Sequence, residues 1–366
     1  MSSPRVDRLG RVRRAMAAAG VDCVLLSLGA DLPWLTGYTA MPLERLTMLV
    51  LPAEGDATLV IARLEAPRVE AAPDVFGLLA WAETQNPVEL VAGLVGNRRH
   101  LAIGDRTWAT FLLQLQAHLP GTTWRNASSV IGPIRAVKDD DEVAALAAAS
   151  AAADRVAAAL LAGDIGLIGR TEAAVSADIG RRLVAEGHER VNFSIVGSGP
   201  NSASPHHDAG DRVIGPAEAV VCDFGGTMDG YCSDITRTVF TGEPSREFLD
   251  LYRVLQQAQG AAVSAAVVGT TCESVDRAAR EIIADAGYGA YFIHRTGHGI
   301  GLEEHEDPYI VSGNVQPLTA GHAFSVEPGI YLPGRYGARI EDIVVASVSG
   351  PRPLNAVDHA LAVVEA

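Results

Sequence analysis

The sequence predicts two domains, an α/β domain over residues 1–130 and an α+β domain over residues 137–366. Three observations lead to this fold class. Strand-like and helix-like segments alternate with short loops up to about residue 125, which is typical of an α/β unit. Gly132-Pro133 then marks a break, and a long Ala-rich helix follows it. Beyond about residue 187, two hairpins that carry acidic residues lie among further helices, which favours an α+β domain.

The first domain is expected to alternate between helices and strands. An amphipathic segment predicts a helix near 5–19, and Gly20 ends it. Further helices are expected near 64–71, 87–96 and 107–118. Apolar runs predict the strands Val21–Leu26, Leu46–Leu51, Thr58–Ile61 and Leu101–Gly104.

The second domain is expected to begin with a long helix. The acids at 139–142 place negative charge at its first turn, and its apolar spacing fits a packed helix rather than a linker. Helices continue to about 187, and a strand follows at 191–197. Further helices are expected near 245–267 and 273–286. The two hairpins cover 219–240 and 323–346, and the segment HRTGHGIGLEEHE precedes the second one.

Composition and charge narrow the partners and the location of the protein. The chain has 44 acidic residues against 29 Lys and Arg, a net charge of −15, which argues against nucleic acid or an anionic membrane as a partner. No apolar run has the length of a membrane span, and the basic N-terminus has no continuous apolar segment before Asp22, so we expect no signal peptide. The four cysteines show no metal-binding spacing and indicate reduced thiols. We therefore expect a cytoplasmic protein.

The first hairpin carries two acids on one face. In the stretch CDFGGTMDGYCSD, residues 222–234, the turn is predicted at Asp229-Gly230, a strong hairpin signal. Paired positions on the two strands then sum to 459. Asp223 and Asp234 therefore point to the same face, one diagonal step apart. Because an unpaired carboxylate is costly to bury, two acids in an apolar hairpin need an explanation.

The second hairpin repeats this arrangement. Glu327 and Glu341 lie symmetrically about Gly334 and can share a face. Four carboxylates that converge on one site cannot all ionise unless positive charge compensates them, and a pair of divalent cations would do so. His298 lies between two glycines, which let the backbone approach closely, and can add one nitrogen ligand. The pattern predicts a two-metal site.

Each of these residues taken alone has a simpler explanation. A single Asp in a strand is more often an edge charge or a turn cap. The acids of GARIED could end a solvated strand and pair with Arg339, and the histidine of GHG could belong to a turn. Five such residues at compatible positions favour the metal site.

Several motifs give the chain a resemblance to a known family. The segments CDFGGTMDGYCSDITRT, HRTGHGIGLEEHE, SVEPGIY and GARIED resemble the pita-bread metallopeptidases, the group of aminopeptidase P, prolidase (Xaa-Pro dipeptidase) and methionine aminopeptidase. SGPNSASPHH is similar to the family's upstream histidine motif, and DLPWLTGY is similar to the Xaa-Pro branch. The resemblance covers essentially the whole chain. It implies a pita-bread catalytic domain behind a creatinase/prolidase-like N-terminal domain.

The resemblance also implies a ligand set for two divalent ions, with manganese expected first and cobalt or zinc as alternatives. Asp234 and Glu341 would bridge the two ions, and Asp223 would chelate one of them. His298 and Glu327 would complete the other. None of the five positions is substituted, which speaks against a metal-free binding module.

Catalytic roles follow from the same resemblance. Glu327 would carry a proton to the leaving nitrogen, and His206 and His305 would stabilise the oxyanion. Arg339 lies two positions before the second bridging acid, where the family has an arginine near its metal acids. His207 is an alternative to His206, because parity lets only one of two adjacent side chains face the site.

The implied activity is hydrolysis of Xaa-Pro bonds, above all in Xaa-Pro dipeptides, through a metal-bridging hydroxide. The segment VSGNVQPLTAGHAF lacks the arginine with which some eukaryotic prolidases hold the dipeptide carboxylate. Aminopeptidase P-type cleavage of longer Xaa-Pro peptides is therefore an alternative, as is a non-peptide amide hydrolase or lyase on the same fold.

The resemblance further implies a homodimer. In it, the N-terminal domain with Trp34 and Tyr38 would close over the site of a neighbouring subunit. The simpler alternative is that both aromatic residues belong to the core, where such side chains commonly pack.

Overall fold

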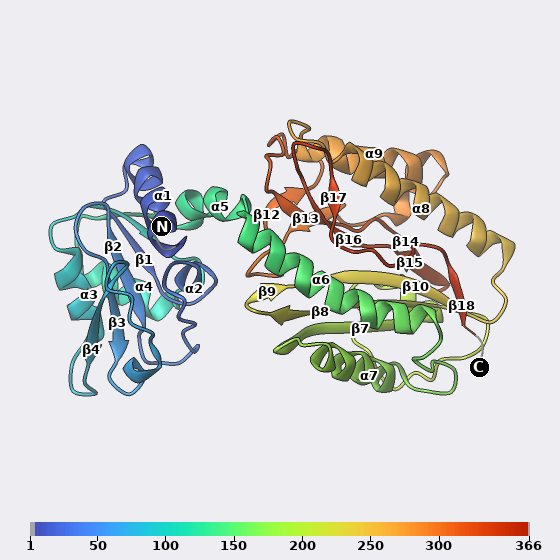
Figure 1. Ribbon diagram of the computed structural model, residues 1–366, viewed down its shortest axis with the longest axis horizontal. Helices are drawn as coiled ribbons and strands as arrows, with labels where there is room; N and C mark the ends of the chain where they lie inside the picture. Colours follow the sequence, from blue (N-terminus) through green and yellow to red (C-terminus); the bar gives the residue numbers. More distant parts are fainter. Residues whose placement is uncertain (1–3, 365–366) are drawn as a thin grey trace. The chain divides into compact units, whose positions relative to one another are not determined.

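In the computed structural model, which describes residues 4–364, the chain forms two compact units, residues 1–135 and 136–366. The first unit is built on a six-stranded sheet in the order β4-β3-β2-β1-β5-β6 (Figure 1). β1 runs antiparallel to β2 and parallel to β5, so the sheet is mixed. Its elements are α1 Pro4–Ala19, β1 Cys23–Leu26, α2 Asp31–Thr36, β2 Met48–Pro52, β3 Thr58–Ala62, η1 Ala66–Arg68, β4 Gly77–Trp81, α3 Pro87–Val95, β5 His100–Ile103, α4 Ala109–His118, β6 Thr123–Asn126 and α5 Ser128–Ala136.

The core of the first unit lies between the central strands and helices α3 and α4. Leu25 and Val50 of the sheet pack in one apolar cluster with Val91 of α3 and Leu115 of α4. Trp34 and Tyr38 are only 2% and 6% exposed, and α2 contains the tryptophan. Their burial favours the interpretation of both residues as core.

Two predictions for this part of the chain are wrong. The helix expected near 64–71 is reduced to the short 3-10 helix η1, because Pro67 has no N–H to continue an α-helical ladder. The break expected at Gly132-Pro133 lies inside α5, where buried Val130 and Ile131 hold the helix together despite the proline. The sequence pattern also does not reveal β4 and β6, which are the two edge strands of the sheet.

The second unit contains two larger sheets and a two-stranded ribbon. The strand orders are β18-β10-β8-β7, with β9 beside β8, then β12-β11-β13-β16-β17, and β14-β15 (Figure 1). The helices are α6 Asp140–Leu161, α7 Glu172–Ala185, η2 Gly199–Ala203, α8 Arg246–Ala265, α9 Cys272–Asp285 and η3 Gly289–Tyr291. The strands are β7 Arg190–Ser198, β8 Glu218–Met228, β9 Tyr231–Cys232, β10 Ile235–Thr241, β11 Gly297–Gly299, β12 Glu306–Ile310, β13 Ala323–Val326, β14 Gly329–Leu332, β15 Tyr336–Arg339, β16 Asp342–Val345, β17 Arg352–Pro353 and β18 Ala362–Val364.

Helix pairs cover the two sheets of the second unit. α6 and α7 share an apolar cluster with β8 and β10, and α8 and α9 share another with β13 to β16. α6 begins with a capping box between Asp139 and Glu142. By length and composition alone, α6 also passes as a membrane-spanning helix, but half of its most apolar window is buried against the rest of this unit. It is therefore explained as a core helix.

Both hairpin registers predicted from the sequence are confirmed. Asp223 pairs with Thr236, so paired positions in the first hairpin sum to 459. In the second, Val326 pairs with Asp342 around the turn at Gly334, where φ is +73°. The two hairpins meet at an isolated bridge between Thr236 and Glu341.

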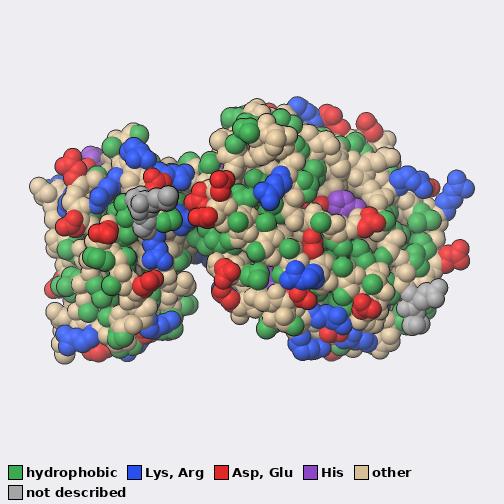
Figure 2. Space-filling model, viewed as in Figure 1, with side chains coloured by type: hydrophobic (Ala, Val, Ile, Leu, Met, Phe, Trp, Pro, Cys, Tyr) green, Lys and Arg blue, Asp and Glu red, His purple; other side chains and the backbone are tan. Residues whose placement is uncertain are grey.

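The surface carries charges of both signs. On the face drawn in Figure 2, Lys and Arg side chains are interspersed with Asp and Glu. All four cysteines of the chain are buried free thiols.

Candidate metal centre

The first hairpin delivers two buried acids to one pocket. Asp223 lies in the middle of β8 and is 8% exposed, and Asp234 lies between β9 and β10 and is 4% exposed. Both line a cavity of about 500 Å³ in the second unit. One carboxylate oxygen of Asp223, Oδ1, is buried and has no hydrogen-bond partner among residues 4–364, which is rare for a buried polar atom.

The second hairpin and β11 deliver the other donors. Glu327 follows β13, and Glu341 precedes β16. His298 is the middle residue of β11, whose flanking glycines are required by packing. A Cβ atom at Gly297 would lie 1.8 Å from the carbonyl oxygen of Ser325, so no larger residue fits there. This confirms the expectation that glycines let the backbone approach closely around the histidine.

These donors converge. Ligand atoms of Asp234, His298 and Glu341 all lie within 4.8 Å of one another. His298 Nε2 is 3.3 Å from Glu327 Oε1 and 3.7 Å from Asp234 Oδ2. The structure thus brings all five residues predicted as ligands to the wall of one cavity.

The pKa shifts in this cluster indicate that the protein alone does not compensate the negative charge of its carboxylates. Burial, followed by the charges of Glu341 and Asp223, raises the pKa of Asp234 well above its usual value. Burial, followed by Glu327, does the same to the pKa of Glu341. Burial also raises the pKa of Glu327 to about 7. Crowded carboxylates whose negative charge is not compensated need positive charge from elsewhere. Carboxylate oxygens together with one imidazole nitrogen suit divalent cations such as Mn²⁺.

Arg339 donates hydrogen bonds from all three of its guanidinium nitrogens to neighbouring residues. Its guanidinium donates to Asp223 Oδ2 at 2.5 Å and to the Tyr331 hydroxyl at 2.7 Å. It also donates to the backbone oxygen of Pro205 and, through Nε, to Thr236 Oγ1. It therefore ties Asp223 to the loop that carries His206 and His207.

The two adjacent histidines of that loop take different directions. His206 lines the cavity. His207 Nε2 instead lies 2.8 Å from Oε2 of Glu172, a fully buried carboxylate at the start of α7. Glu172 also accepts from the Ser198 N–H and hydroxyl and from the Asn201 amide. Of the two alternatives left open by the sequence, the structure places His206 at the pocket.

His305 packs against His298, the histidine predicted as a ligand. Its ring centroid is 4.0 Å from that of His298, and it lines the same cavity. Burial, followed by the positive charge of Arg295, lowers the pKa of His305. The ring is therefore a neutral imidazole near pH 7, with one N–H to donate.

Sequence reasoning does not single out three polar residues that line this cavity: His294, Arg295 and Glu304. All three lie in HRTGHGIGLEEHE, so their nearness to His298 in the chain is the available signal. The apolar wall, Phe193, Ile195 and Pro205, is also missed. The first two alternate along β7, and period-2 alternation is the signal for a shared face.

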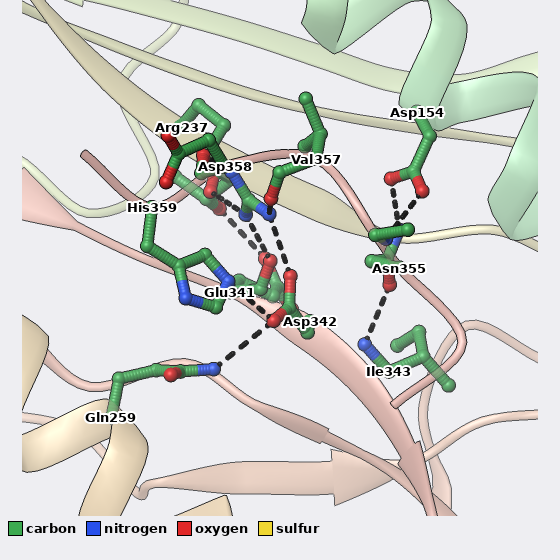
Figure 3. Close-up of polar contacts among 12 residues, drawn as sticks. Asp154, Arg237, Gln259, Glu341, Asp342, Ile343, Asn355, Val357, Asp358 and His359 are labelled. Atoms are coloured by element: carbon green, nitrogen blue, oxygen red, sulfur yellow. Dashed lines mark hydrogen bonds and ion pairs between the residues drawn. The ribbon is translucent and has the colours of Figure 1, made fainter. Parts of the chain in front are cut away.

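A separate polar network lies behind the second hairpin (Figure 3). Arg237 donates to Asp342 Oδ1 at 2.8 Å and to the backbone oxygen of Glu341 at 2.7 Å. His359 Nε2 lies 2.6 Å from Asp342 Oδ2, and Gln259 donates to the same oxygen. Asp342, the residue after a predicted ligand, is thus completely paired within the protein.

Comparison with known proteins gives consistent matches over the whole chain. Residues 143–347 match metallopeptidase family M24, and residues 8–137 match the creatinase/prolidase N-terminal domain. The crystal structure of dipeptidase PepE from Mycobacterium ulcerans is similar with a TM-score of 0.93 and 47% identity, covering 99% of this chain and 98% of that one. Recombinant prolidase from Thermococcus sibiricus is similar with a TM-score of 0.93 and 35% identity over 100% of both chains. The Xaa-Pro dipeptidase of Lactobacillus helveticus is 35% identical, covering 97% of this chain and 98% of that protein.

Proposed function

The chain belongs to metallopeptidase family M24, and from this membership we propose that it is a metal-dependent hydrolase of Xaa-Pro dipeptides. The observation that carries the proposal is the cavity whose lining brings together four carboxylates and one imidazole, with more negative charge than the protein compensates. Full-length relatives bear the names dipeptidase, Xaa-Pro dipeptidase and prolidase, which supports the same activity.

Five residues of this cavity would hold two divalent cations: Asp223, Asp234, His298, Glu327 and Glu341. Of these, Asp234 and Glu341 would be the two acids shared by both cations. Manganese is the first candidate because four of the five donors are carboxylates, with cobalt or zinc as alternatives. When bound, the cations supply Lewis acidity, which makes a water molecule a nucleophile near neutral pH and polarises the scissile carbonyl.

The protein's own groups would move the protons and hold the charge. Glu327, whose pKa is raised by burial to about 7 in the metal-free protein, can accept a proton at Oε1 and release it to the leaving nitrogen. Neutral His305 can donate its N–H to the oxyanion, and His206 would do so from the loop 204–208. Arg339 positions Asp223 and the Pro205 backbone rather than touching substrate.

The pocket wall suits a proline ring. An Xaa-Pro bond has no N–H, so a peptidase cannot seat it through a backbone ladder and needs a shaped pocket instead. Phe193, Ile195 and Pro205 give the cavity an apolar part of its lining beside its charged groups. The leaving group is a secondary amine, which departs only when it is protonated, and Glu327 is placed among the ligands to supply that proton.

Assembly and location are further parts of the proposal. We infer a homodimer from the family resemblance alone. We infer a cytoplasmic location because the four cysteines are free thiols. Sedimentation equilibrium at working concentration measures the mass directly. A monomer would contradict the homodimer.

A peptide panel tests the activity. Purified protein loaded with Mn²⁺, Co²⁺ or Zn²⁺ is offered Ala-Pro, Met-Pro, Ala-Ala and Ala-Pro-Gly, and the released amino acids are measured. We expect Ala-Pro and Met-Pro to be cleaved fastest. Equal or faster cleavage of Ala-Ala would contradict proline selectivity, faster cleavage of Ala-Pro-Gly would favour the aminopeptidase type, and no cleavage of any peptide would favour a non-peptide substrate.

A further inference from the structure

The cavity contains a second arginine that the protein leaves without an acceptor. Arg295 precedes β11, is partly buried and lines the same cavity as the metal acids. Its guanidinium makes no hydrogen bond or ion pair with any residue in the described range 4–364. A partly buried guanidinium has five donors to satisfy, so an unpaired one that faces a cavity indicates a ligand.

The guanidinium is nevertheless held in place. Its central carbon lies 4.5 Å from the ring centroid of Tyr309, which stacks against it. Stacking on an aromatic face fixes the plane of an arginine and leaves the N–H groups at its edge free to donate. Arg295 is thus positioned in advance, whereas Arg339 in the same cavity has already committed its donors to Asp223, Tyr331 and Pro205.

The positive charge of Arg295 affects the pKa values of other residues that line the cavity. After burial, it is the largest cause that lowers the pKa of His305, and it also acts on His298 and Glu327. Glu304 also lines the cavity, and its negative charge would repel an anion from its own side. An anionic substrate group is therefore directed toward Arg295.

We propose that Arg295 binds the C-terminal carboxylate of the substrate and thereby selects dipeptides. The inference rests on the proposed function, because a free carboxylate next to the scissile bond occurs only when the substrate ends one residue beyond that bond. A guanidinium can bind a carboxylate through two parallel hydrogen bonds. A substrate with a C-terminal amide, or with a further residue after proline, has no negative charge at that position. The segment 311–324 needs no arginine if Arg295 fills this role.

The experiment compares two substrates that differ only in this group, Ala-Pro and Ala-Pro-amide, on Mn²⁺-loaded enzyme. The measured quantity is the ratio of kcat/KM for the acid to that for the amide. We expect the Arg295→Met variant to lower this ratio by about 10- to 100-fold, mainly through a higher KM for Ala-Pro. Arg295→Lys, which keeps the charge but not the two-pronged geometry, is expected to give an intermediate ratio.

Controls separate the outcomes. Arg277→Met, on the exposed surface of α9, should keep the wild-type ratio, and metal content and thermal midpoint are measured for each variant. If Arg295→Met slows both substrates equally, Arg295 does not read the carboxylate and the inference is wrong, while the proposed function stands. If wild-type enzyme cleaves neither substrate, the proposed function fails and takes the inference with it.

Discussion

Glu341 and Asp342 are neighbours in the chain and are 2% and 1% exposed, yet their surroundings differ completely. Asp342 faces Arg237, His359 and Gln259 (Figure 3). Although burial alone would raise the pKa of Asp342, His359 and Arg237 hold it below its usual value. Glu341 faces the cavity, where burial and the charges of Glu327 and Asp223 raise its pKa.

The contrast distinguishes a structural acid from an acid kept for a ligand. Where the fold uses a buried carboxylate for itself, it supplies donors from several segments, as it also does for Glu172. In the cavity, the side-chain hydrogen bonds that residues 4–364 donate to the four acids are fewer: Arg339 donates to Asp223, Thr236 to Glu341 and Ser325 to Glu327. Buried charge that is left unbalanced is costly, so the missing positive charge must come from outside the chain.

The largest effect is expected for Glu327→Gln. An amide cannot accept the proton of the attacking water, so turnover should fall by about 10²- to 10⁴-fold. The kcat on Ala-Pro is measured with metal-saturated protein, and the circular dichroism spectrum should match that of the wild type. Glu281→Gln, on exposed α9, is the matched control. Turnover near that of the control would remove Glu327 from the mechanism.

Neutralising each of the two adjacent acids should shift stability in opposite directions. Asp342→Asn leaves Arg237 buried without its charge partner, and we expect it to lower the free energy of unfolding by about 3–5 kcal/mol. Glu341→Gln relieves repulsion and should leave the metal-free protein as stable or more stable. Urea unfolding of chelator-treated protein at pH 7 measures both. Equal losses in the two variants would contradict the division between structural and ligand acids.

A smaller effect is expected at His322, outside both regions. Burial, followed by the charge of Lys138, lowers its pKa to about 4, and its Nδ1 accepts from the Thr319 N–H. In the unfolded chain this histidine binds a proton at about pH 6.5, whereas in the folded protein it stays neutral down to about pH 4. The free energy of unfolding is therefore highest above pH 6.5 and decreases as the pH drops toward 4, by up to about 3 kcal/mol. His322→Gln should flatten this part of the stability profile. An unchanged profile would show that His322 does not contribute.

The smallest effect is expected in the loop 204–208, where His206 lines the cavity and His207 contacts the buried structural acid Glu172. His207→Ala removes the anchor on Glu172 and should lower turnover about 10-fold by loosening the placement of His206, with metal content unchanged. His207→Gln keeps a donor and should recover most of the activity. His206→Ala should cost more than His207→Ala; the reverse order would make His207 the catalytic residue.

The sequence predicts well which acids meet in the cavity, because local rules determine their placement. Turn position sets the register of each hairpin, and register sets which side chains share a face, so Asp223, Asp234, Glu327 and Glu341 could be grouped from the sequence alone. The partners of Asp342 could not be predicted, because Arg237 lies 105 positions before the acid and His359 lies 17 positions after it, outside the hairpin. Edge strands β4 and β6 escape prediction for a related reason, since their pairing is decided by the sheet rather than by their own pattern.

Metal content of the active enzyme tests the central claim most directly. Elemental analysis of purified, metal-saturated protein, paired with Ala-Pro turnover before and after chelation, counts the ions that the unbalanced acids hold. We predict two divalent ions per chain and loss of turnover with the ions. Full activity with one ion or none would contradict the account.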